Sequence, residues 1–306
     1  MEGNDPLPSW RPGSTRDALE AFLAAAEEVP VVERVACFDN DGTLWCERPS
    51  YVQLDFFLDA LRQHVAADPS IGERAEFAAV LSGDQATIAG IGLERIALAL
   101  AGLFEGMGPE EFGSAAREFM GRAVHPTLGR PARSMTYQPM SELIAELRRR
   151  EFTVGIVTGG GTEFVRAISD DLYGVPAELV VGTLIGYDIS RDGEGPPVIR
   201  RTSGLLGVAN EGGAKVANIQ TQLGRRPIVA AGNSGGDREM LEWAQAAGTP
   251  SLALLIDHDD AEREFHYTST AQTFAESEPI TDVGARLGWT VVSMVRDWDV
   301  VFPPLS

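Results

Sequence analysis

The sequence of 306 residues predicts an α/β protein with a Rossmann-like, three-layer α/β/α core, a mainly parallel sheet and an inserted helical domain. Two observations support this prediction. After about residue 130, short apolar runs with strand character alternate with amphipathic helical patterns, as expected for βαβ units. Between residues 51 and 129, in contrast, apolar residues recur only at helical spacing.

The chain before residue 51 contributes the first helix and the first strand. Residues 14–29 have the spacing of an amphipathic helix that Ser14 or Thr15 could cap, and residues 31–38 form an apolar run typical of a buried strand. We therefore expect residues 14–50 and 130–306 to form the core, and residues 51–129 to form a helical domain inserted into it.

Helices and strands alternate through the rest of the core. The patterns predict helices over 140–150, 162–169, 214–223 and 238–247, strands over 153–157, 179–181, 227–231, 251–256 and 290–294, and a hairpin around Asp192 and Gly193. Right-handed crossovers would place the carboxyl ends of the parallel strands, and the loops that follow them, at one edge of the sheet.

The composition argues against several classes of partner. The formal net charge of −20 repels nucleic acid and anionic lipid, so we expect neither as a partner. Two cysteines are too few for a disulfide framework, and there is no secretory signal or apolar run of about 18 residues, so we expect a cytoplasmic protein. Any phosphate site in so acidic a chain must be built locally from a metal ion, a lysine and backbone N–H groups.

The first candidate site residues follow the first predicted strand. Asp39 and Asp41 stand two residues apart in a turn that continues to Gly42 and Thr43. One carboxylate can attack phosphorus while the other protonates the leaving oxygen, which are the two tasks of a phosphoryl transfer. A solvated turn is the alternative, because Asp and Asn favour turns for local reasons.

Three further polar features follow later in the chain. Thr158 precedes three glycines at the end of a strand, where free N–H groups can bind phosphate. Lys215 opens a predicted helix, and Asn233 and Asp237 lie on a glycine-rich turn whose oxygens suit Mg²⁺. Each feature alone could be an ordinary turn or a surface charge, so the interpretation depends on their order and their common place at strand ends.

With these four features in this order, the chain resembles the haloacid dehalogenase-like hydrolase superfamily, and within it the phosphoserine-phosphatase-like branch. The resemblance extends over about residues 31–260, and the inserted helices are similar to the helical cap of that branch. It implies an Mg²⁺-dependent phosphatase that hydrolyses a small-molecule phosphate monoester through an aspartyl-phosphate intermediate.

The resemblance also implies a role for each site residue. Asp39 would be the nucleophile, Asp41 would be the general acid and base, and Lys215 would neutralise the nucleophile and the phosphate. The implied binding sets are Asn40, Thr158, Gly159 and Lys215 for the phosphate, and Asp39, Asp41, Asn233 and Asp237 for the metal ion.

Two positions depart from the family pattern. Asn233 stands where many relatives have Asp, so its oxygen would bring less charge to Mg²⁺, and we prefer Asp237 as a predicted ligand. The glutamate with which related phosphatases read phosphoserine falls one position later than Glu47, where this chain has Arg48. We therefore do not expect phosphoserine to be the substrate.

Some assignments stay open at this stage. A phosphotransferase or phosphomutase would use the same aspartyl-phosphate, and a phosphate-binding module on this scaffold would have no turnover. His258 follows another predicted strand, and we interpret it as part of a polar loop capping a helix with Arg263 and Glu264, not as a metal ligand. The physiological substrate and the oligomeric state are not predicted.

Overall fold

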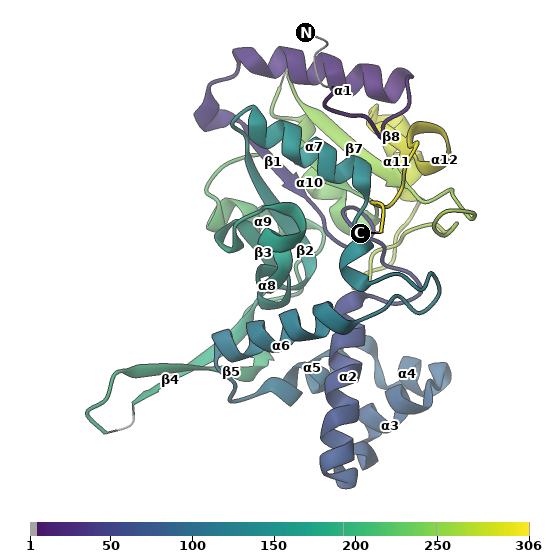
Figure 1. Cartoon of the computed structure of the whole chain (residues 1–306). Helices are drawn as coiled ribbons and strands as arrows, with labels where there is room; N and C mark the ends of the chain where they lie inside the picture. The colour runs from purple at the N-terminus through teal and green to yellow at the C-terminus, as the bar shows by residue number, and fades with distance from the viewer. Residues whose placement is uncertain (1–4, 192, 249, 306) are drawn as a thin grey trace.

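The computed structural model describes residues 5–191, 193–248 and 250–305 and has a sheet of six strands at its centre (Figure 1). The strand order is β3-β2-β1-β6-β7-β8, and every neighbouring pair is parallel. The strands are β1 (Val35–Phe38), β2 (Thr153–Gly161), β3 (Val180–Thr183), β6 (Val229–Gly232), β7 (Leu252–Asp257) and β8 (Thr290–Ser293). The order reverses between β1 and β6, and ligands bind at such a switch point, beyond the carboxyl ends of the strands.

Helices cover both faces of the sheet because the strands bury side chains on both sides. In β1, Ala36 and Phe38 belong to one apolar core, and Val35 and Cys37 belong to a second one. The first core includes side chains of α1 (Ser14–Ala25), α7 (Gln138–Arg149), α8 (Thr162–Tyr173) and α12 (Met294–Asp297), and the second includes side chains of α9 (Gly213–Gln222), α10 (Arg238–Gln245) and α11 (Ile280–Leu287). The predicted three-layer α/β/α fold is confirmed.

Of the six α-helices that lie between β1 and β2 in the sequence, the first five form a block below the sheet in Figure 1. They are α2 (Val52–Ala67), α3 (Ala75–Ser82), α4 (Gln85–Ile91), α5 (Leu93–Ala101) and α6 (Pro109–Arg122). Leu61, Phe77, Ile96 and Leu100 form a small core within this block. The division of the chain into a core and a cap at residues 51 and 129 stays a prediction.

An aromatic cluster joins the inserted helices to the core. Phe56 of α2 stacks on Phe164 of α8 with a centroid distance of 5.4 Å, and it also contacts Phe104, Phe112 and Phe119. All five rings are buried. Because aromatic pairs of this kind add to the free energy of apolar burial, the cluster holds α2 and α6 against α8.

A hairpin of the core chain also contacts the inserted helices. Strands β4 (Ile185–Arg191) and β5 (Pro197–Leu205) form a separate two-stranded sheet, as the turn signal predicted, although Asp192 itself lies outside the described residues. The backbone of Arg201 exchanges hydrogen bonds with Gly106 and Met107, and its guanidinium lies 3.9 Å over the ring of Phe112. Arg201 also pairs with Glu163 of α8, so β5, α6 and α8 meet at one side chain.

Two local expectations near the N-terminus are wrong. Residues Val31–Glu33 form a 3₁₀ turn and β1 begins only at Val35, because Pro30 opens the turn with its restricted φ. Helix α1 has Gly13 at its N-cap without any side-chain cap. The hydroxyl of Thr15 donates to Asp297 (3.0 Å), so it ties α1 to α12 instead of capping the helix.

Among the described residues, no single helix is both long and apolar enough to cross a membrane. One pair of neighbouring helices, Gln85–Ile91 and Leu93–Phe104, passes the test of length and composition when taken together, with a bend of 87° between them. Ile96, Leu100 and Phe104 of this pair are buried against the rest of the protein.

The aromatic cluster makes a stability prediction. Phe56→Ala should lower the free energy of unfolding by about 3–5 kcal/mol, because it removes the ring that contacts both the inserted helices and α8. Leu93→Ala, on the exposed side of α5, is the matched control and should change it by about 0.5 kcal/mol or less. Urea unfolding measures both, and equal effects would contradict the role of the cluster.

Candidate active site

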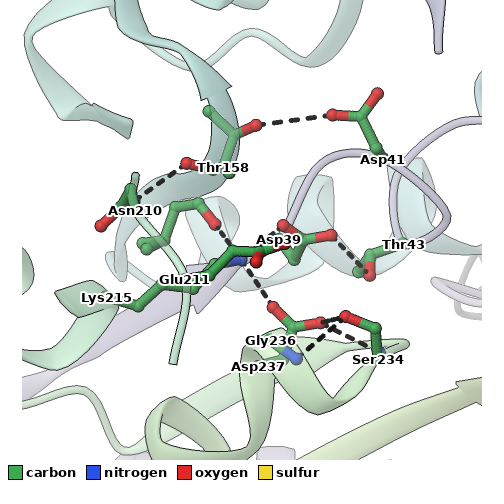
Figure 2. A network of polar contacts seen from close by, with 12 residues as sticks. Asp39, Asp41, Thr43, Thr158, Asn210, Glu211, Lys215, Ser234, Gly236 and Asp237 are labelled. Carbon is green, nitrogen blue, oxygen red and sulfur yellow. Dashed lines mark hydrogen bonds and ion pairs between the residues drawn. The ribbon is translucent and has the colours of Figure 1, made fainter. Parts of the chain in front are cut away.

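Lys215 lies at the centre of the site and contacts residues from three other segments. Its Nζ donates to Asp39 Oδ1 (2.6 Å), to Asp237 Oδ1 (2.6 Å) and to the carbonyl oxygen of Val157 (2.8 Å), as Figure 2 shows for the two carboxylates. All four residues are buried. The structure thus brings the ends of β1, β2 and β6 and the first turn of α9 together, as the topology argument predicted.

Both oxygens of the Asp237 carboxylate accept hydrogen bonds from the protein. Its Oδ2 accepts from the backbone N–H groups of Asn233 (3.0 Å) and Ser234 (3.1 Å), and Oδ1 accepts from Lys215. A Cβ on Gly232 would come within 2.4 Å of Asp237, so the close approach requires glycine there. Asp237 therefore shapes the turn after β6 and fixes Lys215.

Asp41 faces the glycine loop at the end of β2. Its Oδ1 accepts from Trp45 Nε1 (2.9 Å), and its Oδ2 lies 3.5 Å from Thr158 Oγ1, which itself accepts from the Gly160 N–H (2.9 Å). Gly42 beside it has a φ of +74°, and a Cβ there would lie 1.9 Å from Asn233 Nδ2. Only glycine meets both conditions, so the turn can bring Asp41 over the sheet edge.

The oxygens around Thr43 form an arrangement that suits a cation. The Thr43 hydroxyl lies 3.3 Å from Asp39 Oδ2 and 3.4 Å from Asn233 Oδ1, and one hydroxyl hydrogen can serve only one of these acceptors at a time. Within the described ranges, no group of three or more His, Cys, Asp or Glu side chains could hold a metal by itself. The residues fit Mg²⁺, which prefers few protein oxygens and completes its shell with water and phosphate.

Burial and charge shift the pKa values of the central groups. Burial raises the pKa of Asp39 well above its ordinary value and Asp237 adds to the rise, while Lys215 opposes it. Burial alone would lower the pKa of Lys215, but Asp237 and Asp39 raise it, so Lys215 stays a cation. Burial also raises the pKa of Asp41, against the effect of the Trp45 hydrogen bond. A carboxyl group with a raised pKa can hold a proton closer to neutral pH, as a general acid must.

Two residues assigned to the phosphate have other contacts in this structure. Asn40 is buried, and its Oδ1 accepts from the hydroxyl of Tyr173 (3.1 Å). The carbonyl oxygen of Gly159 accepts from Thr183 Oγ1 (2.7 Å). Their phosphate contacts stay predictions, which for Gly159 would involve the backbone N–H and not this oxygen.

The sequence interpretation missed several supporting residues. Asn210 Nδ2 donates to the carbonyl oxygen of Thr158 (2.9 Å), and Asn233 Nδ2 donates to Glu47 Oε1 (3.2 Å) and Ser269 Oγ (3.0 Å). Lone Asn and Ser residues carry no pattern that would have revealed them. Glu47 therefore supports the turn that carries Asn233.

His258 lies in the site and not in a solvated loop. It is buried, its Nε2 is 2.8 Å from the carbonyl oxygen of Gly42, and its Nδ1 is 3.3 Å from Glu264 Oε2. The expected helix with Arg263 and Glu264 is wrong, because the Asp260 carboxylate accepts from the N–H groups of a turn there. The position of His258 directly after β7, at the carboxyl edge of the sheet, was the sequence signal that could have placed it in the site.

The fold and the place of these residues define a class of α/β protein with a polar site beyond the carboxyl ends of a parallel sheet. The family model of the haloacid dehalogenase-like hydrolases matches residues 36–242, which is more than half of the chain, and the chain belongs to this family. The match begins in β1 and ends in α10, so it includes all four sequence features, and the predicted family is confirmed. No curated protein matches the sequence.

Solved structures show the same fold. A protein of unknown function from Bordetella pertussis Tohama I is 18% identical, with a TM-score of 0.52 over 85% of this chain and 98% of that chain. A HAD family hydrolase from Salmonella enterica subsp. enterica serovar Typhi (12% identity, TM-score 0.41, 78% and 67% covered) and a probable phosphoserine phosphatase from Vibrio cholerae (14%, 0.41, 86% and 65%) are more distant. At 18% identity, the likeness to the Bordetella pertussis structure shows the fold alone.

The Lys215 cluster makes a prediction about stability and pH. Lys215→Met should cost about 3–5 kcal/mol of unfolding free energy at neutral pH in metal-free buffer, because Asp39 and Asp237 stay buried without their cation. The pKa of Asp39 is already raised, and loss of the ammonium raises it further. A carboxyl group whose pKa is higher in the folded state stabilises the fold at pH values below its unfolded-state pKa. This contribution is lost as the pH rises through the folded-state pKa. The unfolding free energy that Lys215→Met removes should therefore grow with pH.

Urea unfolding of both proteins between about pH 5.5 and about pH 8 measures this cost, a range that starts above the ordinary pKa of aspartate. Arg62→Met, which removes an exposed cation from α2, is the matched control and should change the stability little at either pH. A cost for Lys215→Met that is the same at both ends of the range would contradict the interpretation.

Proposed function

We propose that this protein is an Mg²⁺-dependent phosphatase that hydrolyses a small-molecule phosphate monoester through an aspartyl-phosphate on Asp39. The main support is the contact between Lys215 and Asp39 Oδ1, which favours the anionic form against the effect of burial and fixes the orientation of the carboxylate. Among the described residues, Asp39 Oδ2 then has only the weak contact with Thr43, and we propose it as the oxygen that attacks phosphorus. Membership of a hydrolase family supports the same reaction class.

The proposed reaction has two steps that use Asp39 and Asp41 in turn. In the first, an oxygen of Asp39 attacks phosphorus, the bond between phosphorus and the leaving oxygen breaks, and Asp41 donates a proton to that oxygen. In the second, Asp41 takes a proton from a water molecule that attacks phosphorus, and the bond to Asp39 breaks to release phosphate. Thr158 Oγ1, 3.5 Å from Asp41 Oδ2, would hold a phosphate oxygen beside the acid.

Mg²⁺ would be held by the Asp39 carboxylate, the backbone carbonyl of Asp41 and the amide oxygen of Asn233. When bound, it neutralises the charge of the phosphoryl group during transfer. Asp237 supports the turn that carries Asn233 and keeps Lys215 in place, and its role as a direct ligand stays a prediction. Membership of this hydrolase family supports a small phosphate ester as the proposed substrate.

The nucleophile has a direct test. Asp39→Asn should lower turnover of p-nitrophenyl phosphate at least about 1,000-fold, because an amide cannot attack phosphorus, while the protein stays folded. Asp17→Asn, an exposed residue of α1, is the control and should keep full activity. EDTA should stop the wild-type reaction and Mg²⁺ should restore it. Full activity of Asp39→Asn, or of the wild type in excess chelator, would refute the mechanism.

The general acid is tested by comparing leaving groups. An alkoxide needs a proton as it leaves, whereas p-nitrophenolate leaves without one, so the first step depends on Asp41 mainly for alkyl esters. Asp41→Asn should therefore lower kcat/KM for propyl phosphate at least about 10-fold more than for p-nitrophenyl phosphate. Equal losses for both esters would show that Asp41 does not protonate the leaving oxygen.

A further inference from the structure

Gln53 connects the first inserted helix to the glycine loop of the site. It is the second residue of α2, and its Oε1 accepts from the backbone N–H of Gly161 (2.8 Å), a residue 108 positions later in the chain. A side chain of the inserted block therefore reaches the loop that follows Thr158. Gln53 belongs to none of the sequence motifs described above.

The glycines of the loop permit this approach. A Cβ on Gly160 would lie 2.7 Å from Gln53 Oε1, 3.2 Å from Thr158 Oγ1 and 3.8 Å from Asp41 Oδ2. A Cβ on Gly161 would lie 2.6 Å from Gln53 Nε2. The carboxamide of Gln53, the Thr158 hydroxyl and the Asp41 carboxylate thus border the same small space over Gly160.

The hydrogen bond to Gly161 also fixes the orientation of the Gln53 carboxamide, and with it the acceptor and donor ends of the group. Because Oε1 is the acceptor for the Gly161 N–H, the other end of the carboxamide is the amino group of Nε2, which can only donate. Within the described part of the chain, Nε2 makes no hydrogen bond, and Gln53 is partly exposed. An oriented donor next to the group that protonates the leaving oxygen is placed to bind the leaving group.

We propose that Gln53 is a positioning residue that donates from Nε2 to an oxygen of the leaving group, so that the substrate is an ester of a hydroxylated or carboxylated small molecule. This inference rests on the proposed phosphatase function. An apolar leaving group would leave Nε2 without an acceptor when the substrate excludes water, which costs binding free energy. The inserted helices then contribute to specificity through one defined side chain at the start of α2.

The test compares two substrates that differ only in hydroxyl groups. Glycerol 3-phosphate and propyl phosphate have the same three-carbon alkyl ester, and only the first has oxygens that can accept from Nε2. The wild-type enzyme should prefer glycerol 3-phosphate, and Gln53→Met should reduce this preference in kcat/KM about 10-fold, mainly through KM, as expected for one lost hydrogen bond. Gln63→Met, on the exposed face of α2, is the matched control and should leave the preference unchanged.

Gln53→Glu separates the proposed role from a structural one. Glutamate keeps the acceptor for the Gly161 N–H but has no donor, so it should lose the preference as Gln53→Met does. If Gln53 only fastens α2 to the loop, Gln53→Glu should keep the wild-type preference and Gln53→Met should reduce turnover of both esters equally, which would overturn the inference. A wild-type enzyme without any preference for the hydroxylated ester would also overturn it.

The proposed phosphatase function is judged separately in the same experiment. Turnover of p-nitrophenyl phosphate that depends on Asp39 and Mg²⁺ establishes the reaction, whatever the two alkyl esters show. Its absence would refute the proposed function itself, whereas its presence with an unchanged preference in Gln53→Met would refute only the role of Gln53.

Discussion

The buried ammonium of Lys215 is the interaction on which the rest of the site depends. Its three contacts come from β2 and from the turns that follow β1 and β6, and each is a short hydrogen bond to a carboxylate or a carbonyl oxygen. The ammonium offsets part of the cost of burying these carboxylates, because an isolated buried charge costs several kcal/mol. Lys215 thus allows two acidic groups to lie close together at the carboxyl edge of the sheet.

The sheet topology makes this arrangement possible. Strand order reverses between β1 and β6, so the loops that follow these two neighbours diverge and leave space at the carboxyl edge. Asp39 and Asn233 occupy the first position after each of these strands. Glycines at 42 and 232 then permit approaches that a Cβ would block, which brings the two turns into contact. The backbone geometry of these turns therefore positions the site residues as much as the contacts between charged side chains do.

The sequence predicted what local pattern and chain topology determine. Alternation of apolar runs identified the six strands of the core apart from the start of β1, and the rule for parallel crossovers placed Asp39, Thr158 and Asp237 together. Lys215 was predicted from its order among these features and from the family resemblance. Contacts between segments with no pattern of their own could not be predicted. The Gln53–Gly161 and Arg201–Phe112 contacts join residues about 90 or more positions apart and depend on how the inserted helices pack, which no local periodicity encodes.

The charge balance of the site argues for a divalent cation. Asp39, Asp41 and Asp237 bring three carboxylates together with the single ammonium of Lys215, and the whole chain carries a formal charge of −20. A phosphate monoester has up to two negative charges near neutral pH, so it would meet repulsion both at long range and at the reacting carboxylate. The single charge of Lys215 offsets only part of this repulsion, because it already faces the carboxylates of Asp39 and Asp237. The additional positive charge must come with the substrate or bind beside it, and the acceptor oxygens of Asp39 and Asn233 around Thr43 are where the protein offers it a place.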